Sequence, residues 1–267
     1  MPLNTIDDVI SALDAIIQRA WEEKSRVGYF AALYRRITRA VRDAVSQRQF
    51  SDCSLMERLD VVFAERYLDA LRAFQAQGKP SKCWHVAFHA CNDDSLLILQ
   101  FLLAGINAHI NLDLGVASAQ VSPGESLAQL KPDFDQINAL LAAQVGAVEE
   151  EMSVLSPLIK NLSLIGLKTE TTLINFNIDL ARKAAWFAAQ RLADEPVVLH
   201  EVTVDGLDLA VSLEGRAILY PPFKGDALAA IRAVEVQDVR RIIETLAGDP
   251  AQSAASEPAD SLSRPSQ

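Results

Sequence analysis

The most apolar stretch of the chain, from Leu96 to Ile110, limits what the chain can fold into more than any other feature. This stretch is 15 residues long, whereas a helix that spans a membrane needs about 20 consecutive apolar residues. A helix this apolar but too short to span a membrane must be covered by other parts of the same domain. We therefore expect a central buried helix over about residues 95–119, preceded by the helix-start sequence Asn-Asp-Asp-Ser at 92–95.

Apolar residues recur at helical spacing along most of the remaining chain, and Gly and Pro are scarce, with 11 of each in 267 residues. Besides the central helix, this spacing predicts helices at residues 6–23, 29–46, 54–76, 133–152, 177–192 and 227–246. Residues 195–223 fit two structures, because the β-branched residues at 197–204 favour strands and residues 207–219 favour a helix. The fold class that these patterns predict is all-α, with one irregular bundle of about eight helices over residues 1–247. Residues 248–267 are mostly Ala, Ser, Pro and acidic residues, and we expect a disordered C-terminal tail there.

Local signals suggest where two of these helices begin and which side of a third faces inward. Ser54 and Glu57 have the spacing of a capping box, so we expect the third helix to begin there. Pro132 is expected to open the long helix at 133–152. In the helix at 177–192, apolar spacing predicts a buried side formed by Leu180, Ala184, Phe187, Ala188 and Leu192.

The charge and cysteine content narrow the classes of partner and compartment. The chain has 25 Lys and Arg against 35 Asp and Glu, a formal net charge of −10. We therefore expect no nucleic-acid binding, because a broad phosphate surface needs an excess of basic residues. Three cysteines cannot build a disulfide framework, and the first ten residues lack the basic start of a signal peptide. These features predict a cytoplasmic protein without a membrane span.

Four polar residues interrupt the central helix: Asn107, His109, Asn111 and Asp113. A buried polar group without a partner costs roughly 1–3 kcal/mol, so each of these needs one. At about 100° per residue, His109 and Asp113 lie on one face of the helix, and Asn107 and Asn111 lie on a face about 200° away. A single straight helix therefore cannot aim all four side chains at one ligand.

The pair of His109 and Asp113 has two interpretations. An imidazole and a carboxylate one turn apart can share a metal ion, with further ligands from other helices. The other interpretation is a structural hydrogen-bond pair in which Asp113 fixes the tautomer of His109. For Asn107 and Asn111 the sequence favours a structural role, since an amide can satisfy backbone groups of a crossing helix.

Asp60 is a second unusual position, because it lies on an otherwise apolar helical stripe with Phe63 and Tyr67. An acid at such a position is either paired with a cation, such as Arg58 or Arg182, or is itself a ligand.

The segment from Cys83 to Cys91 holds two further histidines, His85 and His89. These residue types suit a soft metal, yet the chain has no second cluster of this kind and the cysteine spacing is not that of a zinc ribbon. We interpret the segment as part of the core. The chain also lacks a dinucleotide-binding Gly motif, a phosphate-binding loop, a nucleophile elbow and a His-Glu-x-x-His sequence.

The sequence Leu-Ala-Gly-Ile-Asn-Ala-His-Ile-Asn-Leu-Asp-Leu at 103–114 resembles the signature of the DUF5995 family, whose function is unknown. Weaker matches in the same order occur at 28–38, 58–71 and 181–186. The resemblance implies a mostly helical domain with no established activity, and it favours a helix in the ambiguous region after Glu195. It also makes six positions the first to test, namely Asp60, Asn107, His109, Asn111, Asp113 and Arg182.

A more distant resemblance is to the zinc-dependent phospholipases C and the P1-type nucleases. In those helical enzymes a His-x-x-x-Asp pair on a buried helix binds metal, and residues 109–113 have this spacing. Those families also use several more histidines and a free N-terminal Trp, whereas this chain has 4 His and begins with Met1. The resemblance is therefore compatible with a single-metal site and not with a full trinuclear one.

Two main functions remain open from the sequence. The first is a metal-dependent enzyme, hydrolytic if the ion is zinc, in which the catalytic and metal-binding residues are His109, Asp113 and Asp60. Its substrate would be a small molecule contacted by Asn107, Asn111 and Arg182. The second is a metal-free helical protein that binds a small molecule or shapes it in specialised metabolism, in which the same polar residues orient the ligand or only hold the helices together. A partner-binding or structural role and a homodimer are both compatible with the sequence.

Overall fold

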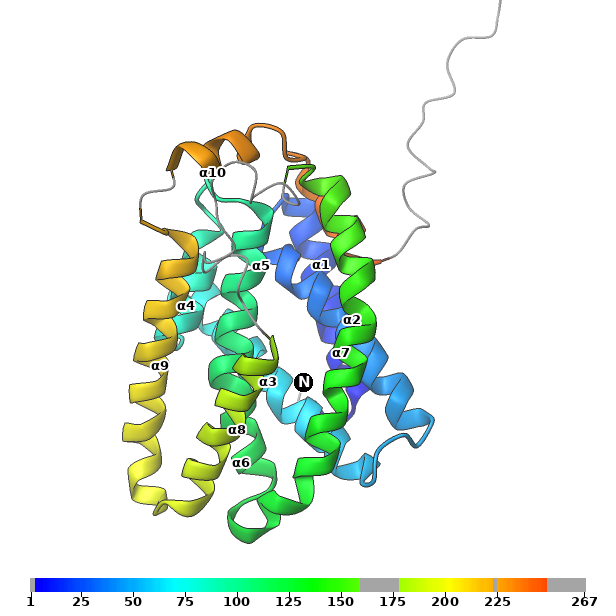
Figure 1. Ribbon diagram of the computed structural model, residues 1–267, viewed down its shortest axis with the longest axis vertical. Helices are drawn as coiled ribbons and strands as arrows, with labels where there is room; N and C mark the ends of the chain where they lie inside the picture. The colour runs from blue at the N-terminus through cyan, green and yellow to red at the C-terminus, as the bar shows by residue number, and fades with distance from the viewer. Residues whose placement is uncertain (1–2, 159–177, 223–224, 249–267) are drawn as a thin grey trace, which may run out of the picture.

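The structure is a computed structural model that describes residues 3–158, 178–222 and 225–248. All regular elements in these ranges are helices, which confirms the all-α prediction (Figure 1). In the view of Figure 1, α7 and α9 flank the bundle on opposite sides and α10 crosses one end. The elements are α1 (Ile6–Glu23), α2 (Val27–Ser46), α3 (Cys53–Gln75), α4 (Lys82–Ala90), α5 (Ile98–Ile106), η1 (Asn107–Leu114), α6 (Gly115–Val121), η2 (Gly124–Ser126), α7 (Leu127–Leu155), α8 (Ile178–Asp194), α9 (Val197–Leu219), α10 (Gly225–Arg232) and α11 (Val239–Ala247).

The predicted central helix is present as three consecutive segments, α5, η1 and α6, that run without a break from Ile98 to Val121. This helix packs against α2, α3, α4, α8 and α9, so it is covered on all sides as expected. It begins three residues later than the Asn-Asp-Asp-Ser sequence suggests, because Asp93 bonds to Ser95 in a local turn. Within the described ranges, no helix combines the length and the apolar character that crossing a membrane requires.

The middle segment, η1, is a π-helix rather than the straight α-helix that the sequence analysis assumes. In a π-helix each N–H bonds five residues back instead of four, and such segments are rare and frequent at functional sites. Asn107, His109, Asn111 and Asp113 all lie in this segment.

Two glycines let other elements approach this helix closely. A Cβ atom at Gly105 would lie 2.6 Å from a ring carbon of Phe30 in α2. A Cβ atom at Gly115 would lie 2.7 Å from the backbone oxygen of Ala185 in α8. Both distances are shorter than van der Waals contact, so these positions require glycine for α2 and α8 to pack as they do.

The close contact of α8 with α6 also explains why one prediction is wrong. Of the residues expected to face inward, Ala188 and Leu192 are buried, yet Leu180 and Phe187 are 66% and 70% exposed. The buried side of α8 instead carries small residues, including Ala185 and Ala188, which fit against Gly115. Small side chains at a close helix contact therefore determine the orientation of α8, and apolar spacing alone does not reveal it.

Two helices begin earlier than predicted. Asp52, not Ser54, caps α3 by accepting a hydrogen bond from the backbone of Leu55. Helix α7 begins at Leu127 and contains Pro132 in its interior. Pro132 is the sixth residue of α7, so its missing N–H removes one of the first backbone hydrogen bonds and leaves the rest of the helix intact.

The C-terminal part of the described chain differs from the prediction in one respect. The ambiguous region is a helix, α9, as the family resemblance favours. The single helix expected at 227–246 is instead two, α10 and α11, separated at residues 233–238. This break allows Glu235 to accept a hydrogen bond from the backbone of Ile98, and Asp238 caps α11. The predicted disordered tail lies outside the described residues, apart from Gly248.

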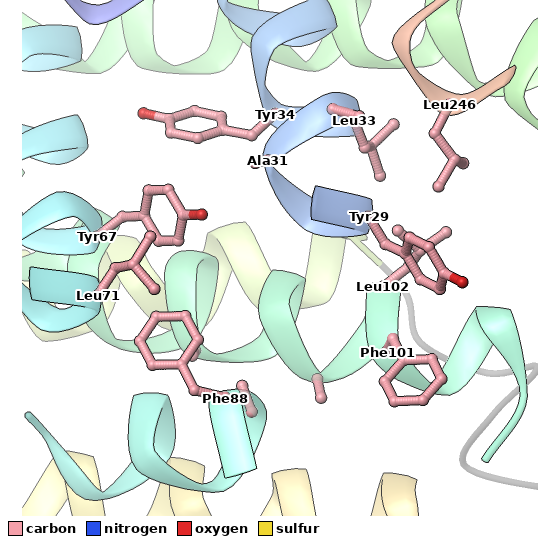
Figure 2. Packing of buried hydrophobic residues seen from close by; sticks show 14 of the residues in the cluster. Tyr29, Ala31, Leu33, Tyr34, Tyr67, Leu71, Phe88, Phe101, Leu102 and Leu246 are labelled. Carbon is pink, nitrogen blue, oxygen red and sulfur yellow. The ribbon is translucent and has the colours of Figure 1, made fainter. Parts of the chain in front are cut away.

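The largest hydrophobic cluster joins α2, α3, α4 and α5 (Figure 2). In Figure 2, Tyr34 of α2 and Tyr67 of α3 lie on neighbouring helices, with Phe88 of α4 below Tyr67. A second cluster joins α3, α6, α7 and α8. A cavity that is partly open to solvent, named the interior cavity below, lies where these clusters meet.

Candidate functional site

The cavity has a volume of about 240 Å³ and is bounded by α2, α3, the central helix, α7 and α8. Its wall is formed mainly by Leu, Ile, Val, Met and Phe side chains. The polar side chains on the wall are Tyr34, Asp60, His109, Gln144, Glu149 and Arg182. Three of the six residues predicted for the site, Asp60, His109 and Arg182, are thus brought together from three helices that lie far apart in the sequence.

His109 is 3% exposed and surrounded by aromatic rings. Its ring stacks on that of Phe63 with centroids 3.6 Å apart and an interplanar angle of 9°. The ring of Tyr34 contacts it edge-on at 4.4 Å. Neither ring nitrogen has a hydrogen-bond partner among the described residues. Burial lowers the pKa of His109, so at neutral pH the imidazole is uncharged and offers one donor and one acceptor.

Asp113 lies beside His109, as the four-residue spacing predicts, but its oxygens are bonded elsewhere. The distance from Nδ1 of His109 to Oδ2 of Asp113 is 3.6 Å, too long for a hydrogen bond. Oδ1 of Asp113 accepts from Nε of Arg66 at 2.8 Å, and Oδ2 accepts from Nε1 of Trp84 at 2.7 Å. Asp113 therefore joins α3, α4 and the central helix, and its carboxylate does not line the cavity.

Asp60 is 8% exposed and carries an unpaired oxygen, Oδ2, that no group in the described ranges bonds. Neither predicted cation neutralises it: Arg58 donates to the carbonyl oxygen of Val121, and Arg182 donates to that of Phe134. Burial, reinforced by the negative charge of Glu57, raises the pKa of Asp60 to about 7. At neutral pH this carboxyl group is therefore present in both protonated and ionised forms.

Two tyrosine hydroxyls belong to the same region and were not identified from the sequence. The hydroxyls of Tyr34 and Tyr67 are buried and have no hydrogen-bond partner within the described ranges, and the two rings lie 5.9 Å apart (Figure 2). Burial raises the pKa of Tyr34 well above its ordinary value, so the hydroxyl keeps its proton. Both residues sit on apolar stripes, and the signal that could have identified them is a hydroxyl at a position where Phe would pack equally well.

Arg182 is 4% exposed and lies against the ring of Phe134, with its guanidinium carbon 4.3 Å from the ring centroid. Its Nε has no hydrogen-bond partner among the residues that the structure describes. Burial lowers the pKa of Arg182 to about 10, so the side chain remains a cation at neutral pH. Arg182 thus adds one unpaired donor to the cavity region.

The two asparagines point away from the cavity, toward α9, as the separation of the two faces predicts. Nδ2 of Asn107 donates to the carbonyl oxygen of Val211 at 2.9 Å. Nδ2 of Asn111 donates to Oδ1 of Asn107 at 2.8 Å and to Glu214 at 3.3 Å. Neither residue lines the cavity, and together they attach the central helix to α9.

The remaining metal-ligand candidates lie elsewhere. His85 and His89 are exposed on α4 with their rings stacked 5.8 Å apart, while Cys83 is buried. Within residues 3–158, 178–222 and 225–248, no three His, Cys, Asp or Glu side chains converge as metal ligands would. The donor set around His109 is thus richer in hydroxyl and aromatic groups than in metal ligands.

The fold and the site define an all-helical protein with an apolar internal cavity and a few unpaired polar groups on its wall. The family model described as a family of unknown function, DUF5995, matches residues 6–221. The match covers most of the chain, and the protein belongs to this family. No curated protein and no solved structure matches the chain, so the distant likeness to zinc-dependent phospholipases and P1-type nucleases receives no support.

Proposed function

We propose that this protein binds an apolar small molecule in the cavity and that Asp60 and His109 hydrogen-bond to the polar group of that molecule. The observation that supports this proposal is a largely apolar cavity whose wall carries buried polar atoms with no partner in the described ranges. Ligand pockets have this composition, since apolar walls supply affinity and a few polar groups set orientation.

The unpaired polar atoms also cost the folded protein free energy. A buried polar atom without a hydrogen bond costs about 1–3 kcal/mol, and natural proteins keep few of them. Here the nitrogens of His109, Oδ2 of Asp60 and the hydroxyl of Tyr34 are in this state around one cavity. A ligand that bonds to these atoms offsets that cost, which favours binding.

The chemistry of the wall favours a particular kind of ligand. His109 is uncharged and Asp60 is partly protonated at neutral pH. These groups both donate and accept hydrogen bonds, which suits a hydroxyl or carbonyl group on an apolar body. The cavity volume of about 240 Å³ limits that body to a few fused rings or a chain of moderate length.

One observation favours an enzyme over a simple binding protein. A general acid or base works best when its pKa lies near the working pH, and burial places the pKa of Asp60 at about 7. Proton transfer between Asp60 and the bound polar group is therefore the reaction step that this cavity suits best. The metal-dependent alternative is weaker, since the oxygens of Asp113 already bond Arg66 and Trp84.

The experiment compares 1-naphthol with naphthalene, two probes that differ by one hydroxyl group. We expect wild-type protein to bind both and to prefer 1-naphthol by about tenfold, since one well-placed hydrogen bond in a buried site is worth about 1.4 kcal/mol. His109→Phe should lose this preference and still bind naphthalene. His89→Phe, which changes an exposed histidine on α4, is the matched control and should behave as wild type.

Two further measurements complete the test. Ile110→Trp fills the cavity and should abolish binding of both probes, whereas Val202→Trp on the surface should not. Equal binding in these two variants contradicts the proposal. Probe binding should also be unchanged by a chelator, and binding that requires added zinc would support the metal-dependent alternative instead.

A further inference from the structure

A second hollow, the basic cleft, lies between α4, α9 and the end of α3, and has a volume of about 860 Å³. The side chains that give it its name are Arg66, Lys79, Lys82, His85 and Arg216. This concentration of positive charge is unusual in a chain whose formal net charge is −10. Whether the cleft can bind an anion depends on which of these positive charges the protein itself neutralises.

Two acids in the cleft, Asp205 and Asp208, are already engaged. The carboxylate of Asp208 accepts the backbone N–H groups of Lys82 and Cys83 at 2.7 and 2.9 Å, which caps the start of α4. Nζ of Lys82 lies 3.6 Å from Asp208 and 3.9 Å from Asp205. The two acids therefore balance Lys82 and the positive end of the α4 dipole.

The other cations differ in their partners. Arg66 forms its ion pair with Asp113 at 2.8 Å. Lys79 and Arg216 are exposed, and their side chains have no ion pair or hydrogen bond with any described residue. Two positive charges at one cleft are thus left for an anion from outside, because the acids of the cleft are used elsewhere.

The cleft also has an apolar side. Leu209 and Leu213 of α9 are exposed to solvent and line the cleft, and Val86 adds to the apolar surface. Large apolar residues on a surface that are one helical turn apart and border a hollow are typical of a binding site.

We propose that the basic cleft is a binding site for an anionic amphiphile. Lys79 and Arg216 bind its phosphate or carboxylate head group, and Leu209 and Leu213 contact its apolar part. This site is separate from the interior cavity, and the proposal does not depend on the proposed function of that cavity.

The test titrates the 267-residue chain calorimetrically with octyl phosphate and, in a second arm, with octanoate, both below the concentration at which they form micelles. We expect the double variant Lys79→Gln/Arg216→Gln to bind octyl phosphate at least about tenfold more weakly than wild type, because two charge contacts are lost. The control Arg19→Gln/Lys183→Gln removes the same charge from exposed positions on α1 and α8 and should bind within about twofold of wild type. The octanoate arm shows whether the site selects phosphate over carboxylate.

Three results would overturn the proposal. One is that Lys79→Gln/Arg216→Gln and the control double variant bind octyl phosphate with equal affinity. Another is the absence of binding by wild type at about 1 mM probe, which corresponds to a free energy too small for a specific site. The third is loss of octyl phosphate binding in the cavity-filling Ile110→Trp variant, which would place the probe in the interior cavity. Replacing Leu209 and Leu213 by Ser should weaken binding without changing its dependence on salt.

Discussion

The two faces of η1 differ in how their polar groups are satisfied. On the α9 side, Asn111 donates to Oδ1 of Asn107 and to Glu214, and Asn107 donates to the carbonyl oxygen of Val211. On the cavity side, both nitrogens of His109 and an oxygen of Asp60 have no partner in the described part of the chain. The polar groups that hold helices together have hydrogen-bond partners. The polar atoms around the cavity have none in the described part of the chain and are available to a bound molecule. The predictions below test this difference.

The largest expected effect is the pH dependence that Asp60 gives to stability. Its pKa is raised from about 4 in the unfolded chain to about 7 in the folded protein. The folded state therefore binds more protons between these values, and stability falls as the pH rises from about 4 through 7, by about 4 kcal/mol in all.

Urea unfolding of wild type and Asp60→Asn across this pH range measures the effect. Wild type should lose stability relative to the variant as the pH rises. His109 acts in the opposite direction, since its lowered pKa removes stability as the pH falls below about 6.5, but this contribution cancels between the two proteins. A difference that does not change with pH would show that Asp60 is solvated, and a difference of the opposite sign would show that it is paired with a cation.

The second effect concerns Asp113, which lies beside His109 but bonds to α3 and α4 and does not line the cavity. Asp113→Ala should lower the free energy of unfolding by about 3 kcal/mol, because the buried indole N–H of Trp84 and the guanidinium of Arg66 lose their acceptor. Chemical denaturation at neutral pH measures this loss. A loss below about 1 kcal/mol would mean that Asp113 does not fix the helices that it contacts.

The third-largest effect on stability is expected for Asn107→Ala, which tests the hydrogen bonds on the α9 side of η1. The substitution leaves the amide of Asn111 and the carbonyl oxygen of Val211 with one bond fewer, so we expect a loss of about 1–2 kcal/mol in stability. Binding of a probe in the cavity should not change, because Asn107 does not line it. A loss of probe affinity with unchanged stability would reverse the roles assigned to the two faces.

The smallest effect on stability belongs to His109→Phe. This variant should be within about 1 kcal/mol of wild type, since its nitrogens have no hydrogen bonds to lose and a phenyl ring can keep the stacking on Phe63. Thermal unfolding compares it with Asn107→Ala. If His109→Phe is the less stable of the two, His109 has a structural partner and the contrast between the faces fails.

Much of the central helix could be predicted from the sequence. A short, strongly apolar stretch identifies the covered helix, and the four-residue spacing places His109 beside Asp113 and Asn107 beside Asn111. These predictions succeed because they depend on local geometry, which a change from α-helix to π-helix alters only slightly over one turn.

The rest depends on contacts between distant parts of the chain. The inward face of α8 follows from the fit of Ala185 against Gly115, and the break before α11 follows from the bond between Glu235 and Ile98. The cavity itself needs residues from α2, α3, the central helix, α7 and α8 together. No local pattern encodes such a space, so Asp60 could be recognised as unusual but not as part of a cavity.

The central claim is that the unpaired polar atoms on the cavity side of η1 form hydrogen bonds with the polar group of a bound molecule. The direct measurement is the nitrogen NMR spectrum of His109 in histidine-labelled protein, which is simple to assign because the chain has 4 His. Addition of 1-naphthol should shift the His109 nitrogen signals, and naphthalene should leave them nearly unchanged. Signals of His109 that do not respond to 1-naphthol while the probe binds would contradict the account.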